Sequence, residues 1–353
     1  MNNSRIPIRF FYTLAILLFF SHAILARGNA ENGAADHTAV PQRVVQAGPA
    51  AFMVENALYL FPEAFDRVVA VADGDQGRGF FIGDLDSMIH SKTVLPRRAN
   101  TEAILALRPD VVVMKKSAKS SMGEPLERLK IATFYLDLES PEAWMNDLET
   151  VGRLFDNPDR VYTLKNHFTS RISFVTGKTS ALQDQEKPRT LFLYWSVKNG
   201  VTTVNIPPIS WMQTHMVQMA GGIPVWMEAE NTDGWIRTGI EQIAAWDPDM
   251  IIVAAYHIDA PEAVKIIKSD AIWSEFRAVK NGEVYAVPTD YHSWDQPDVR
   301  WLLGLQWLAS VLHPNLFDDL DMLEEAMRFY QDMFGMTRQE FNTYVRPKLI
   351  GLD

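Results

Sequence analysis

The sequence of 353 residues contains no cysteine. This absence excludes disulfide bonds, thiolate metal sites and a cysteine nucleophile. It also excludes the acylated N-terminal cysteine on which a lipoprotein depends. Whatever stabilises the fold or binds a ligand must therefore come from packing, hydrogen bonds and charges.

Basic residues are outnumbered, since 33 Lys and Arg face 44 Asp and Glu, and the formal net charge is −11. This balance excludes nucleic acid as an expected partner. An acidic surface suits docking onto a basic protein face, although simple solubility explains it equally well. The motifs G-x-S-x-G, H-E-x-x-H and the glycine-rich phosphate loop are also missing, so we expect no enzyme.

The first 30 residues have the pattern of a secretory signal peptide. Arg5 and Arg9 precede an apolar run at residues 10–20, and small residues follow at Ala23, Ala26 and Ala30. The run is too short for a stable membrane span, although an uncleaved anchor is the alternative. Because no cysteine can carry a lipid, we expect a cleaved, unanchored protein in the periplasm of a Gram-negative cell.

The rest of the chain alternates short apolar runs with helical patterns, which is typical of an α/β fold with parallel or mixed sheets. Its length is sufficient for two cores of ordinary size. The predicted strands are residues 43–47, 67–72, 111–114 and 133–136 in the first half, and 190–194, 250–254 and 284–287 in the second.

One helix of about 20 residues is predicted between the two halves. It begins with Asn157 and Pro158, in the usual order of cap and then proline. Apolar residues at positions 161, 164, 168, 172 and 175 mark one face. We interpret it as a rigid connector, with an N-terminal lobe at 41–157, the helix and linker at 158–187 and a C-terminal lobe at 188–353. An ordinary surface helix within one domain is the alternative.

The strongest signal is a duplicated block. Residues 102–110 (EAILALRPD) and 241–249 (EQIAAWDPD) share Glu, Ile, Ala, Pro and Asp at the same positions, and an apolar run follows each. Each block is predicted to be a short helix that proline ends. Glu102 and Glu241 then lie in the first turn, where the helix dipole favours an anion. They are either simple N-terminal carboxylates or a matched pair of surface charges.

The duplicated block, the linking helix and the export signal together resemble the helical-backbone (class III) periplasmic substrate-binding proteins of ABC importers for iron siderophores, haem or vitamin B12. The stretch from Trp301 to Thr337 is similar to the iron-complex branch. The resemblance implies two Rossmann-like lobes joined by a single long backbone helix, with the ligand in a cleft between them. It also implies that Glu102 and Glu241 form salt bridges with arginines of the two permease subunits.

The function that the resemblance implies is a monomeric periplasmic receptor without a cofactor. It would bind an iron(III) siderophore or similar metal chelate and deliver it to the permease dimer of an ABC importer in the inner membrane. A haem or corrinoid (cobalamin) receptor of the same fold is the first alternative. A periplasmic metallochaperone or enzyme is the second.

A cleft for a metal chelate needs aromatic surface for the organic scaffold and cations for its oxygen atoms. The carboxyl ends of strands meet the ligand crevice in open α/β sheets, so we select residues that follow strands. Each could instead belong to the core or the solvated surface. The candidate contacts are Phe52, Arg78, Phe80, Arg97, Arg98, Tyr194, Trp195, Trp235, Arg237, Tyr256, His257, Tyr291, His292 and Trp294.

Two Tyr-His pairs among these candidates, at residues 256–257 and 291–292, could instead ligate a bare metal or haem iron. Trp301 and Trp307 lie six residues apart in an apolar helical stretch, and we assign both to the core.

Overall fold

The computed structural model describes residues 40–74, 76–198, 200–229 and 232–352. The predicted signal peptide lies outside the described residues. Within the described part of the chain, no helix is both long enough and apolar enough to cross a membrane.

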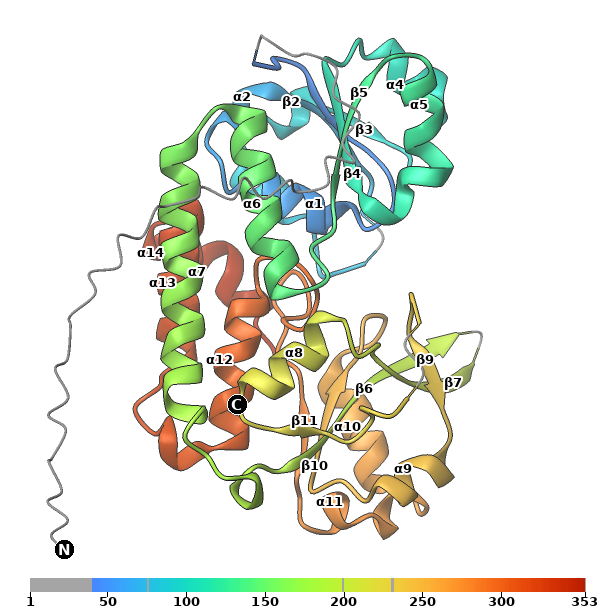
Figure 1. Ribbon diagram of the computed structural model, residues 1–353, viewed down its shortest axis with the longest axis vertical. Coiled ribbons are helices and arrows are strands. Elements are labelled where there is room, and N and C mark those ends of the chain that lie inside the picture. Colours follow the sequence, from blue (N-terminus) through green and yellow to red (C-terminus); the bar gives the residue numbers. More distant parts are fainter. Residues whose placement is uncertain (1–39, 75, 199, 230–231, 353) are drawn as a thin grey trace, which may run out of the picture. The chain divides into compact units, whose positions relative to one another are not determined.

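The first half of the described chain builds a five-stranded sheet in the order β3-β2-β1-β4-β5, with every pair parallel (Figure 1). All four strands predicted here are confirmed, while β3 was missed because two of its three residues are exposed and give no apolar run. The strands are β1 (Val44–Gln46), β2 (Val68–Ala72), β3 (Thr93–Leu95), β4 (Val111–Lys115) and β5 (Ala132–Leu136). The connecting helices are α1 (Ala51–Leu58), α2 (Glu63–Arg67), α3 (Phe81–Leu85), α4 (Thr101–Ala106) and α5 (Glu124–Arg128).

The second half builds a mixed sheet in the order β11-β10-β6-β7-β9, with β8 paired to the start of β6. Its three predicted strands are confirmed and are mutually parallel, whereas β7 is antiparallel to both β6 and β9. Sequence patterns missed β7 and β9, because both are partly exposed and give no continuous apolar run. The strands are β6 (Arg189–Lys198), β7 (Val201–Ile206), β8 (Ile223–Pro224), β9 (Ile236–Thr238), β10 (Met250–Ala254) and β11 (Val284–Ala286).

Two helices, α6 (Pro141–Phe155) and α7 (Pro158–Thr179), connect the sheets in sequence. The predicted start of α7 is confirmed, since Oδ1 of Asn157 accepts a hydrogen bond from the N–H of Arg160 at 3.0 Å. Its apolar face buries Phe168 between Trp144 and Trp301. The helix ends at Thr179, within the segment 158–187 that was predicted to hold the helix and its linker. The lobe boundaries at 157 and 188 stay a prediction.

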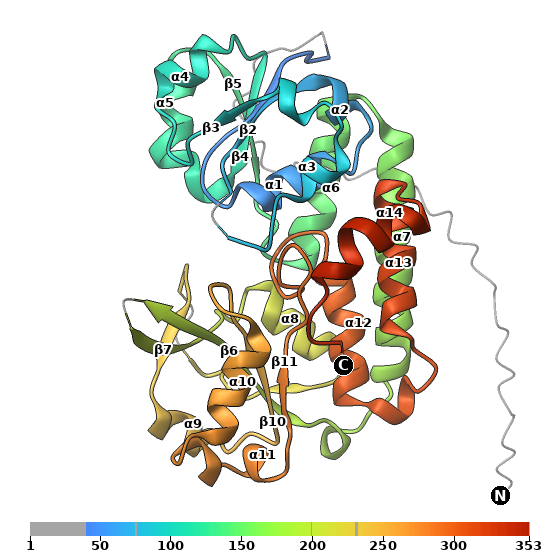
Figure 2. The same cartoon turned by 180° about the vertical axis from the view of Figure 1, so that it is seen from behind.

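The C-terminal helices pack along α7. Both views show α13 beside α7 (Figures 1 and 2), and α12 contacts α7, α8 and α13. Trp301 and Trp307 of α12 are buried, as predicted. The helices of this half are α8 (Met212–Met219), α9 (Ile240–Trp246), α10 (Ala260–Ser269), α11 (Arg277–Lys280), α12 (Trp301–Leu312), α13 (Met322–Phe334) and α14 (Arg338–Glu340).

The duplicated block folds in the same way in both sheets: α4 leads into β4, and α9 leads into β10. Arg108 and Asp247, which precede the two prolines, both have left-handed backbone, with φ values of 49° and 41°. Proline disfavours helical geometry at the residue before it, so each helix ends here and the chain turns directly into a buried strand.

Candidate functional site

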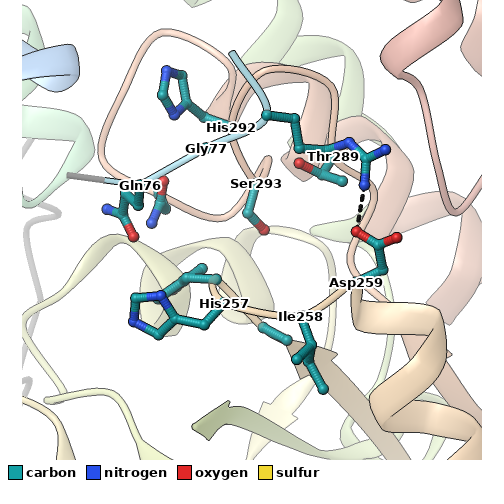
Figure 3. A pocket seen from close by; sticks show the side chains of 12 residues that line it. Gln76, Gly77, His257, Ile258, Asp259, Thr289, His292 and Ser293 are labelled. Atoms are coloured by element: carbon teal, nitrogen blue, oxygen red, sulfur yellow. Dashed lines mark hydrogen bonds and ion pairs between the residues drawn. The ribbon is translucent and has the colours of Figure 1, made fainter. Parts of the chain in front are cut away.

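A cavity of about 140 Å³ lies where the loop after β2 meets the loops after β10 and β11 (Figure 3). All three loops leave the carboxyl ends of parallel strands, the edge at which open α/β sheets bind ligands. The lining is mostly polar. It consists of Gln76, Gly77, Arg78, Ala255, Tyr256, His257, Ile258, Asp259, Thr289, His292, Ser293 and Gln296.

Arg78 and Asp259 form an ion pair on the wall of this cavity, marked by the dashed line in Figure 3. Their side chains are 36% and 45% exposed, so both charges remain accessible. The backbone of Arg78 is held on both sides: its N–H donates to the carbonyl oxygen of Tyr291 at 2.7 Å, and its carbonyl oxygen accepts from Nζ of Lys348 at 3.3 Å. The cavity therefore offers one cation in a fixed position, already paired with one carboxylate.

Close packing fixes the loop after β2 against the loop after β11. Gly77 has φ +107°, and a Cβ atom there would lie 2.5 Å from the carbonyl oxygen of Tyr291 and 2.6 Å from Nδ1 of His292. The ring of His292 also stacks on Phe52 at 3.9 Å between ring centroids. Burial holds the pKa of His292 well below its usual value. A neutral imidazole from the second half of the chain thus packs against Gly77 and Phe52 of the first half.

Asp295 fixes the floor beneath the cavity. Its carboxylate accepts hydrogen bonds from Oγ of Ser293, from the hydroxyl of Tyr256 at 2.6 Å and from Nε2 of Gln213 at 3.2 Å. Burial raises the pKa of Asp295, although these donors oppose the shift. The loops after β10 and β11 are thereby tied to each other and to α8.

A fully buried charge cluster supports the loop after β11. Arg300 donates from Nε to Asp290 and from Nη1 to Asp298, each at 2.7 Å, and all three side chains have no exposed surface. Nδ2 of Asn56, on α1, donates to the same Asp298 oxygen at 2.6 Å. Burial raises the pKa of Asp298, and the Arg300 cation opposes that shift. The cluster joins α1 of the first half to the loop that carries Thr289–Gln296.

Aromatic side chains extend the site to one side. Tyr256 stacks on Tyr194 at 4.4 Å, Trp235 lies 5.1 Å from Tyr194, and Trp211 packs edge-on to Trp235 at 5.6 Å. All four are partly exposed. We call these four residues the aromatic cluster. Tyr256 belongs to both the cluster and the cavity wall, so the two surfaces are continuous.

The structure brings together about half of the predicted contacts. The cavity is lined by Arg78, Tyr256, His257 and His292. Two more predicted contacts, Tyr194 and Trp235, adjoin the cavity through Tyr256. Phe52 stacks on His292 and so supports the cavity wall. The predicted contacts that do not line the cavity and are exposed elsewhere are Phe80, Arg97, Arg98 and Arg237.

Three predicted contacts lie in the hydrophobic core. Tyr291 and Trp294 have no exposed surface, and Trp195 has 5%. The indole N–H of Trp294 donates to Asp290 at 3.0 Å, which commits its one polar atom to the buried charge cluster. This placement argues against the predicted ligand contact of all three, because a strand end points some side chains into the core and others into the crevice.

Several lining residues were not predicted. The same rule about strand ends could have found them, but only aromatic and cationic side chains were selected from each loop. The unselected polar residues are Gln76, Asp259, Thr289, Ser293 and Gln296.

The sequence and the fold match known proteins. The family described as periplasmic binding protein matches residues 91–291, which is more than half of the chain. The chain belongs to this family. It is a substrate-binding protein of the kind that serves ABC transporters, in a family of transport receptors rather than enzymes, and such proteins act in the periplasm or outside the cell.

Two of the relatives are named for different ligands, molybdate and haem, and a third is named as a substrate-binding lipoprotein. Molybdate-binding protein MolA of Haemophilus influenzae is 23% identical over 256 residues, or 67% of this chain and 70% of MolA. The substrate-binding lipoprotein YvrC of Bacillus subtilis is 25% identical over 62% of this chain and 67% of its own length. The haem uptake protein IsdE of Staphylococcus aureus is 24% identical over 54% of this chain and 63% of its own length.

Solved structures confirm the predicted fold class of two Rossmann-like lobes. A periplasmic solute-binding protein of Veillonella parvula has a TM-score of 0.65 and 21% identity, covering 86% of this chain and 92% of its own. MolA of Haemophilus influenzae, bound to molybdate, has a TM-score of 0.64 and 19% identity, covering 85% and 95%.

The geometry of this family member does not support direct metal ligation by the two Tyr-His pairs. The hydroxyl of Tyr256 is committed to Asp295, and that of Tyr291 to Asp84 at 2.6 Å. Figure 3 shows the two histidines on opposite sides of Ser293. Among the described residues, no group of three or more His, Asp or Glu side chains could hold a metal ion.

The two duplicated glutamates occupy equivalent places. Glu102 is the second residue of α4 and Glu241 the second residue of α9, and both are exposed. The sequence prediction of matched carboxylates in two first helical turns is confirmed. Their role in docking stays a prediction.

Proposed function

We propose that this protein captures an anionic, oxygen-rich metal complex in the periplasm and delivers it to an ABC importer. The observation that carries the proposal is the accessible Arg78 guanidinium on a cavity continuous with the aromatic cluster. Guanidinium groups bind carboxylate and other anionic oxygen atoms with strong, directed hydrogen bonds. Partly exposed aromatic rings supply contact area for an organic scaffold.

The first candidate ligand is an iron(III) siderophore or a similar metal chelate. Typical ligand pockets have volumes of roughly 300–1,000 Å³, whereas this cavity has about 140 Å³. A chelate of that size therefore requires the loops around Arg78 to separate and the site to extend over the aromatic cluster. Trp211, Tyr194 and Trp235 are partly exposed and available for that contact.

The second candidate is a bare oxyanion such as molybdate. It would occupy the cavity at its present size, where Arg78 and Thr289 offer a cation and a hydroxyl group. The relative MolA is named for molybdate. Both candidates surround a metal with negatively charged oxygen atoms, so one cationic site serves either.

Haem and corrinoids are less well supported, although IsdE is a haem uptake protein. Of the two Tyr-His pairs, the exposed His257 is the residue that could supply an axial ligand to their metal, because His292 is buried and both tyrosine hydroxyls are committed. The metallochaperone alternative lacks support, since no group of three or more His, Asp or Glu side chains among the described residues could hold a metal ion.

Export and docking complete the proposal. We expect the signal peptide to be removed and the mature protein to work without a lipid anchor. In addition, the exposed Glu102 and Glu241 are proposed to pair with basic residues on the two permease subunits. The mass of the protein recovered from its native host would show where the signal peptide is cleaved.

The proposal is tested by titrating the purified protein with iron(III) citrate, an iron(III) tris-catecholate, haemin and molybdate, with sulfate as the control anion. Tryptophan fluorescence and calorimetry would report binding. We expect Arg78→Gln to weaken binding at least tenfold and Arg98→Gln, an exposed cation away from the cavity, to leave it unchanged. Binding of haemin alone, or full affinity in Arg78→Gln, would contradict the proposal.

A further inference from the structure

We infer that Asp259 is an internal competitor of the cargo, which occupies Arg78 in the empty protein and releases it when an anionic ligand binds. The inference rests on the proposed function, because it assumes an anionic cargo. A carboxylate is unexpected in an anion-binding cavity, because it repels the ligand. The inference gives the Asp259 carboxylate a specific role there.

The first observation is the position of the ion pair. Arg78 and Asp259 both line the cavity, and the guanidinium is directed at the Asp259 carboxylate. A carboxylate and an anionic ligand present the same kind of oxygen acceptor to a guanidinium. The cargo and Asp259 therefore require the same donors on Arg78 and would repel each other if both remained there.

The second observation is that Asp259 can leave Arg78, because its carboxylate is not held by its own helix. It is the N-cap residue of α10, yet its side chain accepts no hydrogen bond from that helix. An N-cap aspartate normally accepts from the N–H of the second or third helical residue. The second residue is Pro261, which has no N–H, and the N–H of Glu262 already donates to the backbone carbonyl oxygen of Asp259 at 2.9 Å. The Asp259 side chain is 45% exposed, so solvent is the partner that its carboxylate can take in place of Arg78.

Another helix of the same chain shows the ordinary arrangement. Asp321 is the N-cap of α13, and its carboxylate accepts from the N–H groups of Leu323 and Glu324 at 2.9 and 3.1 Å. Asp259 differs from Asp321 in having a cation within reach. A rotation of the Asp259 side chain would exchange Arg78 for solvent beside the helix N-terminus, where the helix dipole also favours an anion.

This exchange would suit a protein that must release its cargo. In the empty site, the carboxylate pairs with Arg78. The apparent affinity for an incoming anion is then the intrinsic affinity multiplied by the fraction of time that the guanidinium is free. During delivery, the same carboxylate returns to Arg78 as the ligand leaves. Asp259 would thus set both the affinity and the rate of dissociation.

The test compares Asp259→Asn with the unmodified protein, using molybdate and an iron(III) tris-catecholate as probes. Asparagine keeps the size and the capping ability of aspartate but removes the competing charge. We expect affinity to rise about tenfold, as for a site that is free about one tenth of the time. Stopped-flow measurement should show slower dissociation, and the melting temperature should change little.

Two further variants make the result specific. Glu262→Gln removes one negative charge three residues away on a side chain that does not line the cavity, and it should leave affinity unchanged. Arg78→Gln should lose binding. If Asp259→Asn binds no more tightly than Glu262→Gln while the unmodified protein still binds, the exchange is overturned and the proposed function stands. If neither the unmodified protein nor any variant binds either probe, both the exchange and the proposed function are overturned.

Discussion

Arg43 and Arg189 hold equivalent places at the starts of the two sheets. Each donates a hydrogen bond from Nη2, at 2.7 Å, to a carbonyl oxygen at the end of the duplicated helix: Leu107 for Arg43 and Trp246 for Arg189. The last carbonyl groups of a helix lack partners within it, and a cation there is favoured by the helix dipole. The structural repeat therefore extends beyond the block that the sequence comparison found.

The aspartates of the duplicated block complete this arrangement. Oδ2 of Asp110 accepts from the N–H of Arg43 at 2.9 Å, and Oδ2 of Asp249 accepts from the N–H of Arg189 at 2.8 Å. The two arginines are 146 residues apart, whereas Asp110 and Asp249 are 139 apart. This difference in spacing is why a comparison at a fixed offset does not reveal the arginines.

The close packing of Gly77 predicts the effect of adding one methyl group. Gly77→Ala forces a Cβ atom to within 2.5 Å of the Tyr291 carbonyl oxygen at φ +107°. We expect a loss of about 2–3 kcal/mol in the free energy of unfolding and at least tenfold weaker ligand binding.

Gly200→Ala is the matched control, because its φ is also positive (+77°) but no atom lies within 4 Å of the added Cβ. It should cost about 1 kcal/mol and leave binding intact. Equal effects in the two variants, measured by urea denaturation and titration, would contradict the prediction.

Two tryptophans should separate binding from folding. Trp294 is fully buried, so Trp294→Ala should lower the free energy of unfolding by about 3–5 kcal/mol. Trp235 is partly exposed in the aromatic cluster, and Trp235→Ala should mainly weaken binding of an iron(III) tris-catecholate. Chemical denaturation and fluorescence titration would measure the two quantities. A Trp235→Ala protein that loses stability but binds normally would remove the aromatic cluster from the site.

Asp147 should make stability depend on pH. Burial raises its pKa from 3.8 to about 7, although its Oδ2 accepts from the N–H groups of Asp137 and Leu138, each at 2.8 Å. The folded state therefore holds a proton that the unfolded state has released, and the free energy of unfolding falls as pH rises from about 4 to about 7. Each unit of pKa shift corresponds to about 1.4 kcal/mol, so the fall attributable to Asp147 is at most about 4 kcal/mol.

Asp147→Asn tests this dependence, because it keeps the accepting oxygen and removes the titration. Relative to the unmodified protein, the variant should gain stability between pH 4 and pH 8 in urea denaturation. Glu142→Gln, an exposed site on the same helix, is the control. Parallel stability profiles for the unmodified protein and Asp147→Asn would show that Asp147 does not titrate in this range.

The matched glutamates predict a separation of binding from transport. The double variant Glu102→Arg, Glu241→Arg should change the free energy of unfolding by less than about 1 kcal/mol, because both side chains are exposed. It should bind cargo normally. Each reversed charge would oppose a basic residue of the permease, so uptake into reconstituted vesicles should fall more than tenfold. Glu142→Arg is the control for a reversed charge elsewhere on the surface. Normal uptake by the double variant would remove the docking role.

The sequence by itself determined the features that depend on neighbouring residues. Buried strands such as β4 and β10 are continuous apolar runs, the start of α7 is specified by Asn157 and Pro158, and the repeat of Glu102 at Glu241 is visible as letters. Strands with exposed residues, such as β7, were missed because half-solvated strands lack that apolar signal. The family resemblance depended on the same local patterns, and it predicted the fold without specifying the ligand.

Only the tertiary structure decided which loop residues meet. Arg78 and Asp259 are 181 positions apart, and nothing in their local sequences indicates that they form an ion pair. Trp235 and Trp294 are the same residue type near comparable sheet edges, yet one is partly exposed in the aromatic cluster and the other lies in the core. The physical reason is that hydrophobicity predicts burial on average, whereas the direction of a side chain after a strand depends on backbone geometry and on contacts with distant segments.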